Sequence, residues 1–341
     1  MQIIKLPFLG LTIMFLVSCI PQTISDSTTP TSVVSHEIAA IENIESIWNI
    51  SNVNITRESF CPELSAGMGK VCYIGIFGEP QDYEDIVCLA SNTGTFLWQE
   101  EAGITPNLIV TSVGIFMTYS RMASPSWLAK LDPQNGDLVW RNDLGSLNSV
   151  LFLSYINNQI QLYTDPDDHF WIIDPGGNLV KKVFIGRTFA LMPDETYNNL
   201  TGINAYKTDT NKFLWEHNDR IELVPLFTQD KIFLRNGPMG GVAKALNRKT
   251  GKLLWSTPDI IISNLAYSPE KKLVYALRQN GDLIGIDENS GTENVIARFS
   301  SAPFIVNGGE FDAFEMAYDE EEHIIIVSLG DSRQLFAFKE K

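Results

Sequence analysis

The stretch Ala245–Trp255, ALNRKTGKLLW, joins two short apolar segments through a polar turn. Asn247 can accept backbone N–H bonds and so open the turn, while Gly251 can supply the positive φ that closes it. Ala245 and Trp255 stand ten positions apart, and a small side chain beside a large indole satisfies the volume demands of a packed core. The stretch therefore predicts a hairpin whose last strand carries a buried tryptophan.

The same pattern recurs along the chain. Four further copies of eleven residues are Cys88–Trp98, Lys130–Trp140, Ala205–Trp215 and Gly285–Val295. A sixth copy, Ile173–Lys181, is shorter and degenerate. The closing positions 98, 140, 181, 215, 255 and 295 are separated by 42, 41, 34, 40 and 40 residues. A period near 40 residues is typical of a repeat architecture, and four short strands per repeat make a β-propeller blade.

The runs between these turns are short and rich in β-branched and aromatic residues, for example KIFLRN and EHIIIVSL, which predicts an all-β chain. Each tryptophan is expected to be buried against a neighbour. The residue ten positions earlier is small in four of the five full copies, and Lys130 is the exception. The predicted docking residues are Trp98, Trp140, Trp215 and Trp255, with Cys88, Ala205, Ala245 and Gly285.

The two ends of the chain supply the halves of one more copy. Trp48 has no turn before it, and Ala337 lies on a strand-like run with no turn or tryptophan after it. We expect these halves to pair, which closes the ring and leaves no free edge. Five full copies, the degenerate copy and this composite predict seven blades, with eight as the alternative.

A small residue, Asp or Asn two positions later, Thr-Gly and a closing Trp together resemble the repeat of the pyrroloquinoline-quinone-like β-propeller superfamily. The resemblance covers about Trp48 to Phe338. Together with the N-terminal signal described next, the chain is similar to the propeller lipoproteins of the outer-membrane β-barrel assembly machinery. The resemblance implies a scaffold, and the quinone enzymes' cofactor, calcium ligands and adjacent cysteine pair have no counterpart that we can match here.

The N-terminus indicates export. An uncharged apolar run, LPFLGLTIMFLV, follows Lys5 and has the length of a signal-peptide core. Its end, LVSC, resembles a lipobox, which predicts cleavage before Cys19 and lipid attachment to that cysteine. We therefore expect a signal peptide at 1–18, a Ser/Thr/Pro-rich tether at 19–36 and the propeller at 37–341. An ordinary signal peptide with an incidental cysteine is the alternative.

The formal charge of −16 becomes −17 once Lys5 is removed with the signal. This acidity argues against binding nucleic acid and against an electrostatic grip on anionic lipid. Three cysteines remain in the body, and the preferred disulfide is Cys61–Cys72, with Cys72–Cys88 as the alternative and packing as the role of Cys88. No zinc-type spacing is present.

The search for chemistry finds no catalytic, cofactor-binding or metal-binding residues. The acidic runs 165–169 and 319–323 lack the spacing of calcium loops and are interpreted as solvated hairpin turns. The Gly-rich segment Gly237–Gly241 is interpreted as a blade hairpin, and the four histidines are scattered.

The sequence thus predicts a monomeric, non-catalytic lipoprotein of the bacterial envelope that binds another envelope protein or a peptide. The alternative is a small-ligand binder or quinoprotein-like enzyme using the central channel. The sequence names neither the partner nor the membrane that holds the anchor.

Overall fold

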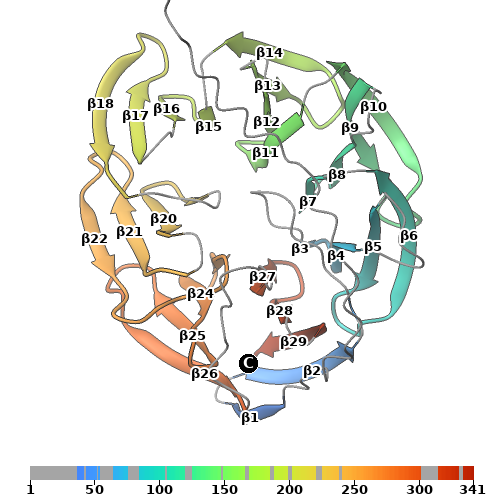
Figure 1. The fold of residues 1–341 in the computed structure, drawn as a ribbon, viewed down its shortest axis with the longest axis vertical. Coiled ribbons are helices and arrows are strands. Elements are labelled where there is room, and N and C mark those ends of the chain that lie inside the picture. The colour runs from blue at the N-terminus through green and yellow to red at the C-terminus, as the bar shows by residue number, and fades with distance from the viewer. Residues whose placement is uncertain are drawn as a thin grey trace, which may run out of the picture. The chain divides into compact units, whose positions relative to one another are not determined.

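The computed structural model describes residues 37–41, 44–51, 53, 64–75, 84–103, 106–119, 125–146, 149–165, 169–184, 188–198, 202–219, 225–237, 240–300, 314–329 and 333–341. These residues form an all-β propeller of seven four-stranded antiparallel blades, and the described part contains no helix. The prediction of seven blades is confirmed, and the alternative of eight is wrong. Figure 1 shows the blades arranged around a centre, with β6, β10, β14, β18, β22, β26 and β2 at the periphery.

Each of the first six blades is built from four strands that are consecutive in the chain. The strands of blades 1 to 3 are β3 (Leu64–Gly67), β4 (Lys70–Gly75), β5 (Glu84–Ala90), β6 (Phe96–Gly103); β7 (Leu108–Thr111), β8 (Gly114–Tyr119), β9 (Pro125–Leu131), β10 (Leu138–Ser146); β11 (Ser149–Ile156), β12 (Gln159–Asp165), β13 (His169–Ile173) and β14 (Leu179–Phe184). Those of blades 4 to 6 are β15 (Thr188–Leu191), β16 (Glu195–Asn198), β17 (Ile203–Lys207), β18 (Lys212–His217); β19 (Leu226–Phe227), β20 (Lys231–Arg235), β21 (Ala243–Asn247), β22 (Leu253–Ser256); β23 (Ala266–Ser268), β24 (Leu273–Leu277), β25 (Asp282–Asp287) and β26 (Glu293–Phe299).

Blade 7 joins the two ends of the described chain, as expected. Its first three strands are β27 (Phe314–Asp319), β28 (Ile324–Leu329) and β29 (Gln334–Glu340), and its outer strand is β2 (Ile44–Ser51). Trp48 lies directly opposite Ala337 in this pairing, so the two predicted half-motifs meet in space. The short strand β1 (Ile38–Ile41) pairs with β26 and adds a fifth strand to blade 6.

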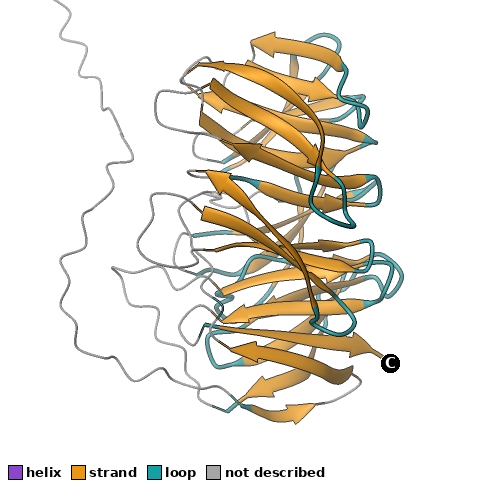
Figure 2. Cartoon of the chain, turned by 90° about the vertical axis from the view of Figure 1, so that its right-hand side faces the viewer, coloured by secondary structure: helices purple, strands orange, loops and turns teal. Residues whose placement is uncertain are grey.

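In blades 1 to 6 the third and fourth strands are joined by one of the repeated turns, which we name the docking turn. In blades 2, 3, 5 and 6 the side chain at the predicted opening position accepts a backbone N–H. The bonds run from Gln134 to Asp132 at 2.7 Å, Asn178 to Asp174 at 2.8 Å, Thr250 to Asn247 at 3.0 Å and Ser290 to Asp287 at 2.7 Å. In each blade the first and third strands run in the same direction, so the turns that follow them lie on the same face of the propeller. Figure 2 shows these turns, coloured teal, together on one side.

The predicted tryptophans lie on outer strands, and each contacts the docking turn of the next blade. Every indole N–H donates to a backbone carbonyl of that turn. The pairs are Trp48 with Ser91 at 2.7 Å, Trp98 with Pro133 at 3.2 Å, Trp140 with Pro175 at 3.2 Å, Trp215 with Arg248 at 3.0 Å and Trp255 with Glu288 at 3.0 Å. Trp140 does this although Lys130, not a small residue, lies opposite it.

The positive-φ glycine of each of these turns lies against the indole. A Cβ placed on the glycine would come within 3 Å of the ring or its Cβ: 2.9 Å at Gly94 with Trp48, 2.7 Å at Gly136 with Trp98, 2.9 Å at Gly177 with Trp140, 2.4 Å at Gly251 with Trp215 and 2.7 Å at Gly291 with Trp255. These glycines are therefore required twice, once by the backbone conformation and once by the neighbouring ring.

The exceptions follow the same rule. Blade 3 has Lys181 in place of tryptophan, and the next docking turn has Asn211 at φ 52° in place of glycine. Blade 6 has Val295, and the next blade has no docking turn because β29 and β2 are not consecutive in the chain. One predicted pair is shifted, because Gly285 lies opposite Asn294 and not Val295. The β-bulge of blade 6 lies before Gly285, farther from the docking turn than in the other blades.

The predicted small-to-large pairs are otherwise confirmed by the strand register. Cys88 lies opposite Trp98, Ala205 opposite Trp215 and Ala245 opposite Trp255. All three small residues are fully buried. The tryptophan thus fills the space beside a small residue of its own blade and the space above a glycine of the next.

Asp319 corrects one interpretation. The segment 319–323 is the hairpin turn between β27 and β28, as expected, but Asp319 is fully buried rather than solvated. It accepts a hydrogen bond of 2.6 Å from the Ser91 hydroxyl and so ties blade 7 to blade 1. The segment 165–169 lies partly outside the described residues.

The end of β29 carries a half-buried carboxylate, Glu340, held between two blades. It accepts hydrogen bonds from the Tyr275 hydroxyl of blade 6 and, at 2.6 Å, from the Tyr318 hydroxyl of blade 7. Burial raises the pKa of Glu340 from 4.5 to about 7; the charge of Glu270 raises this pKa further and Lys271 opposes the shift.

Replacing Gly251 by alanine should lower the free energy of unfolding by roughly 2–4 kcal/mol, because alanine adds left-handed backbone strain and a clash with Trp215. The matched control is Gly285→Ala. Its new Cβ would meet nothing nearer than 3.4 Å, and three other blades carry alanine at that position. We expect that change to stay within about 0.5 kcal/mol. Guanidinium unfolding curves measure both; equal losses would contradict the docking account.

Glu340 should make stability depend on pH near neutrality. A carboxyl whose folded pKa is raised contributes stability that is full below its unfolded pKa, near 4.5, and is lost as pH rises through about 7. The wild type should therefore lose stability relative to Glu340→Gln between pH 4.5 and pH 7. Urea unfolding of both proteins at several pH values gives the difference directly. A difference that does not change with pH would rule out this assignment.

Candidate functional site

The inner strands surround a central channel that opens on the face of the docking turns. Its main cavity measures about 800 Å³ and is lined by side chains from all seven blades. A neighbouring cavity of about 650 Å³ shares six of the lining residues, including Tyr155, Tyr318 and Glu320. Asp194, Gln229, Pro269 and Glu320 follow the first strands of their blades, so the cavity reaches the turn face.

Most of the lining is apolar. The apolar side chains come from all seven blades and include Leu64, Leu108, Ile156, Met192, Leu226, Phe227, Leu265 and Met316. Because the first strand of each blade borders the axis, consecutive residues of one strand, such as 64–66 and 153–156, line the cavity. A mostly apolar cavity of this size falls within the range of ligand-binding sites, roughly 300–1,000 Å³.

Three tyrosines line the cavity, and their hydroxyls are already engaged. Tyr155 donates to Asn158 Oδ1 at 2.5 Å and Tyr267 donates to Glu288 Oε2 at 2.5 Å. Tyr318 donates to Glu340, as described above. These bonds fix the orientation of the three rings, so the aromatic surfaces are what the tyrosines offer to a ligand.

The mouth of the channel is acidic. Exposed carboxylates come from Asp194 of blade 4 and from Glu320 and Glu321 of blade 7. Burial raises the pKa of the Tyr318 hydroxyl, and the negative charge of Glu320 contributes to that shift. Among the described lining residues Arg248 is the one Lys or Arg, and it forms an ion pair of 3.0 Å with Glu195.

The sequence-predicted docking residues lie away from this channel. None of Trp48, Trp98, Trp140, Trp215 and Trp255, and none of their small partners Cys88, Ala205, Ala245, Gly285 and Ala337, lines either cavity. The channel residues were missed, although Glu320 belongs to the acidic run 319–323 that was interpreted as a hairpin turn. The signal that could have found Asp194 and Glu320 is positional: each follows the first strand of a repeat.

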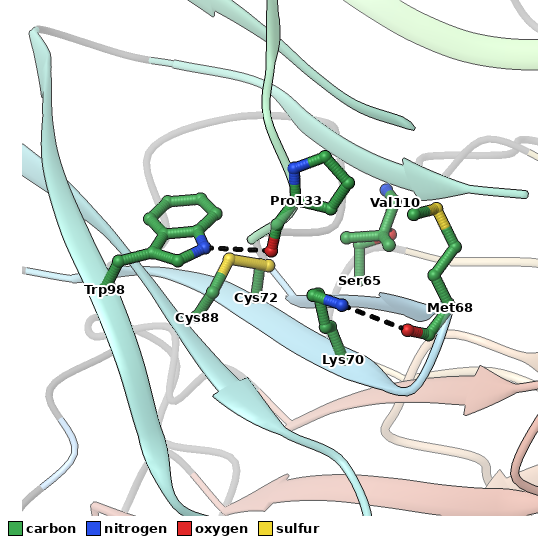
Figure 3. The surroundings of a disulfide bond; sticks show 8 residues. All are labelled: Ser65, Met68, Lys70, Cys72, Cys88, Trp98, Val110 and Pro133. Atoms are coloured by element: carbon green, nitrogen blue, oxygen red, sulfur yellow. Dashed lines mark hydrogen bonds between the residues drawn. A yellow bond between two sulfur atoms is a disulfide. The ribbon is translucent and has the colours of Figure 1, made fainter. Parts of the chain in front are cut away.

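Cys72 and Cys88 form a disulfide. The preferred pairing Cys61–Cys72 is therefore wrong, and the alternative pairing is the one observed. Cys88 is a disulfide partner as well as a packing residue. The reason is register: Cys72 on β4 lies directly opposite Cys88 on β5, with a Cα–Cα distance of 4.1 Å. Both residues are fully buried. Figure 3 shows the bridge beside the indole of Trp98, whose N–H reaches Pro133 in blade 2. Cys61 and Cys19 lie outside the described residues.

The described residues contain no group of three or more His, Cys, Asp or Glu side chains that could hold a metal ion. Of the histidines, His36 lies outside the described part, and His169, His217 and His323 belong to three different blades. Gly237–Gly241, partly described, lies between β20 and β21 as expected. The described part also has no helix long and apolar enough to cross a membrane.

Removing the disulfide by the double change Cys72→Ala and Cys88→Ala should lower the free energy of unfolding by about 2–4 kcal/mol. The bridge closes a segment of 16 residues, which limits the unfolded chain. Non-reducing peptide mapping should recover Cys72 linked to Cys88. Cys61→Ser serves as the control and should leave that linkage intact. A map in which Cys72 is linked to Cys61 would contradict the assignment.

The fold and site can now be compared with known proteins. A crystal structure of BamB from Moraxella catarrhalis matches with a TM-score of 0.49 and 11% identity, covering 87% of this chain and 99% of that chain. A chain in the crystal structure of a mitotic checkpoint complex matches with a TM-score of 0.57 and 11% identity, covering 91% and 99%. At this identity the second likeness shows the fold alone. No curated protein sequence matches.

One family model matches more than half of the chain. It is described as outer membrane protein assembly factor BamB and covers residues 126–311, that is 186 of 341 residues. The matched range runs from β9 of blade 2 to the end of blade 6 and includes three of the repeated tryptophans. The chain therefore belongs to the family of outer membrane protein assembly factor BamB.

Proposed function

We propose that this protein is a membrane-anchored scaffold of the bacterial envelope that binds another envelope protein or a peptide and catalyses no reaction. A lipid on Cys19 would hold the propeller at the membrane, facing the periplasm or the exterior. The family description, an assembly factor of outer membrane proteins, supports a binding role in the envelope.

The channel mouth is the observation that carries the proposal. Seven blades contribute to one open, largely apolar surface, with tyrosine rings and exposed acidic residues at its edge. Apolar centres with aromatic anchors and a polar rim are what protein-binding surfaces present. The rigid outer ring of docked tryptophans keeps this surface preformed, which reduces the ordering cost of binding.

A small-ligand site in the same channel is the alternative, favoured by its volume of about 800 Å³. The quinone cofactor implied by the repeat superfamily does not fit it. Pyrroloquinoline quinone is a polycarboxylate, whereas the mouth carries Asp194, Glu320 and Glu321, and the lining Arg248 is already paired with Glu195. Like charges would oppose binding.

The anchor is tested with Cys19→Ala in the full-length chain. The wild type should sediment with membranes and carry the mass of a lipid, whereas the variant should be exported but remain in the soluble extracytoplasmic fraction. Fractionation with immunoblotting and mass spectrometry measures both. A variant that stays on membranes after a carbonate wash would show that the lipid is not the anchor.

The binding role is tested by affinity purification of the lipidated wild type from detergent-solubilised envelopes of its own source. We expect one envelope protein to be recovered in near-stoichiometric amount. Gly251→Ala, which weakens the ring at a residue that does not itself line the channel, should reduce the recovery. Recovery of no partner, together with a small molecule bound in the purified protein, would favour the alternative.

A further inference from the structure

The acidic groups at the channel mouth have no assigned role in holding the fold. Asp194, Glu320 and Glu321 are exposed, and no ion pair is described for any of them within the described ranges. By contrast, the buried acidic residues of the same turns are engaged: Glu195 with Arg248 and Asp319 with Ser91. The structure thus separates acids that join blades from acids that face the channel mouth.

The uncompensated charge at the mouth is negative. The lining cation, Arg248, is held by Glu195 at 3.0 Å and donates to the Thr228 carbonyl at 3.1 Å, so its charge is compensated. The carboxylates of Asp194, Glu320 and Glu321 are not compensated in this way. A cleft lined by charges of one sign with low-dielectric walls attracts ligands of the opposite sign.

The tyrosine rings add a second preference for cations. Tyr155 and Tyr318 line both cavities together with Glu320, and Tyr267 lines the larger one. Their hydroxyls are bonded to protein acceptors, so the rings are fixed in position and present π surface. An ammonium or guanidinium group over such a ring is attracted by its quadrupole. The same cavity is also lined by apolar side chains, among them Met192, Leu226 and Phe227.

We propose that the channel mouth binds an extended cationic peptide segment. Its Lys or Arg side chains would lie against Asp194, Glu320, Glu321 and the tyrosine rings, and an apolar side chain would enter the cavity. This names the chemistry of the partner for the scaffold role proposed above and rests on that role.

The test uses the full chain and a fluorescent, end-blocked peptide of alternating lysine and leucine as the probe. Fluorescence anisotropy should show saturable binding that weakens as salt rises. The triple variant Asp194→Asn, Glu320→Gln, Glu321→Gln should bind at least tenfold more weakly. The same peptide with glutamate for lysine should not bind, and one with serine for leucine should bind more weakly than the parent.

The matched control removes the same charge elsewhere. Glu45→Gln, Glu100→Gln and Glu216→Gln neutralise three exposed acids on the outer strands β2, β6 and β18 and should leave binding unchanged. Equal weakening in both triple variants would mean that net charge, not the channel, attracts the peptide. Absence of binding by the wild type would also overturn the proposal.

Failure of the peptide-binding proposal can be told apart from failure of the scaffold role. If the channel variant recovers the same envelope partner as the wild type, the scaffold stands and the channel is not its docking site. If the wild type binds the peptide but recovers no partner from envelopes, the channel chemistry stands and the scaffold role fails.

Discussion

The docking of an indole onto the next blade's turn is the interaction on which this propeller depends. The ring fills space beside a small residue of its own blade, lies on a glycine of the next, and donates its N–H to that turn's carbonyl. One side chain thereby supplies buried area, shape complementarity and a directional hydrogen bond between two neighbouring sheets. Where the indole is missing, the glycine is missing too, as at Lys181 and Asn211, or the turn itself does not exist, as beyond Val295.

Because the blades are joined at their outer strands, the inner strands do not have to fill the axis. The result is a preformed channel with seven inner strands around it. Ion pairs between blades add to this ring. Arg248 in the docking turn of blade 5 pairs with Glu195 on β16 of blade 4. Lys231 on β20 of blade 5 pairs at 3.6 Å with Glu288 in the docking turn of blade 6, so here the cation is on the strand and the anion in the turn. The docking tryptophans and glycines do not line the candidate binding surface, which lets that surface vary while the ring of docked blades is kept.

The sequence was sufficient for the features that depend on local order. Turn chemistry, the period near 40 residues and the half-motifs at Trp48 and Ala337 predicted seven blades and their closure, and the structure confirms both. Features that depend on strand register were not accessible. The partner of Cys72 is decided by which residue lies across β4 and β5, and the bulge of blade 6 shifts Gly285 to Asn294. The channel mouth gathers Asp194 and Glu320, which are 126 residues apart, and no pattern in a single repeat reveals that meeting.

The closure of blade 7 has a consequence for the order of events in the cell. β29, near the end of the chain, lies between β28 and β2, so the outer strand of that blade has no partner until the last strand has formed. Synthesis proceeds from the N-terminus, so β2 is made before most of the body and remains without β29 until the last strand follows. During that interval its edge is open to other strands. Mispairing at the edge of β2 is therefore favoured until β29 has been made and has paired with it.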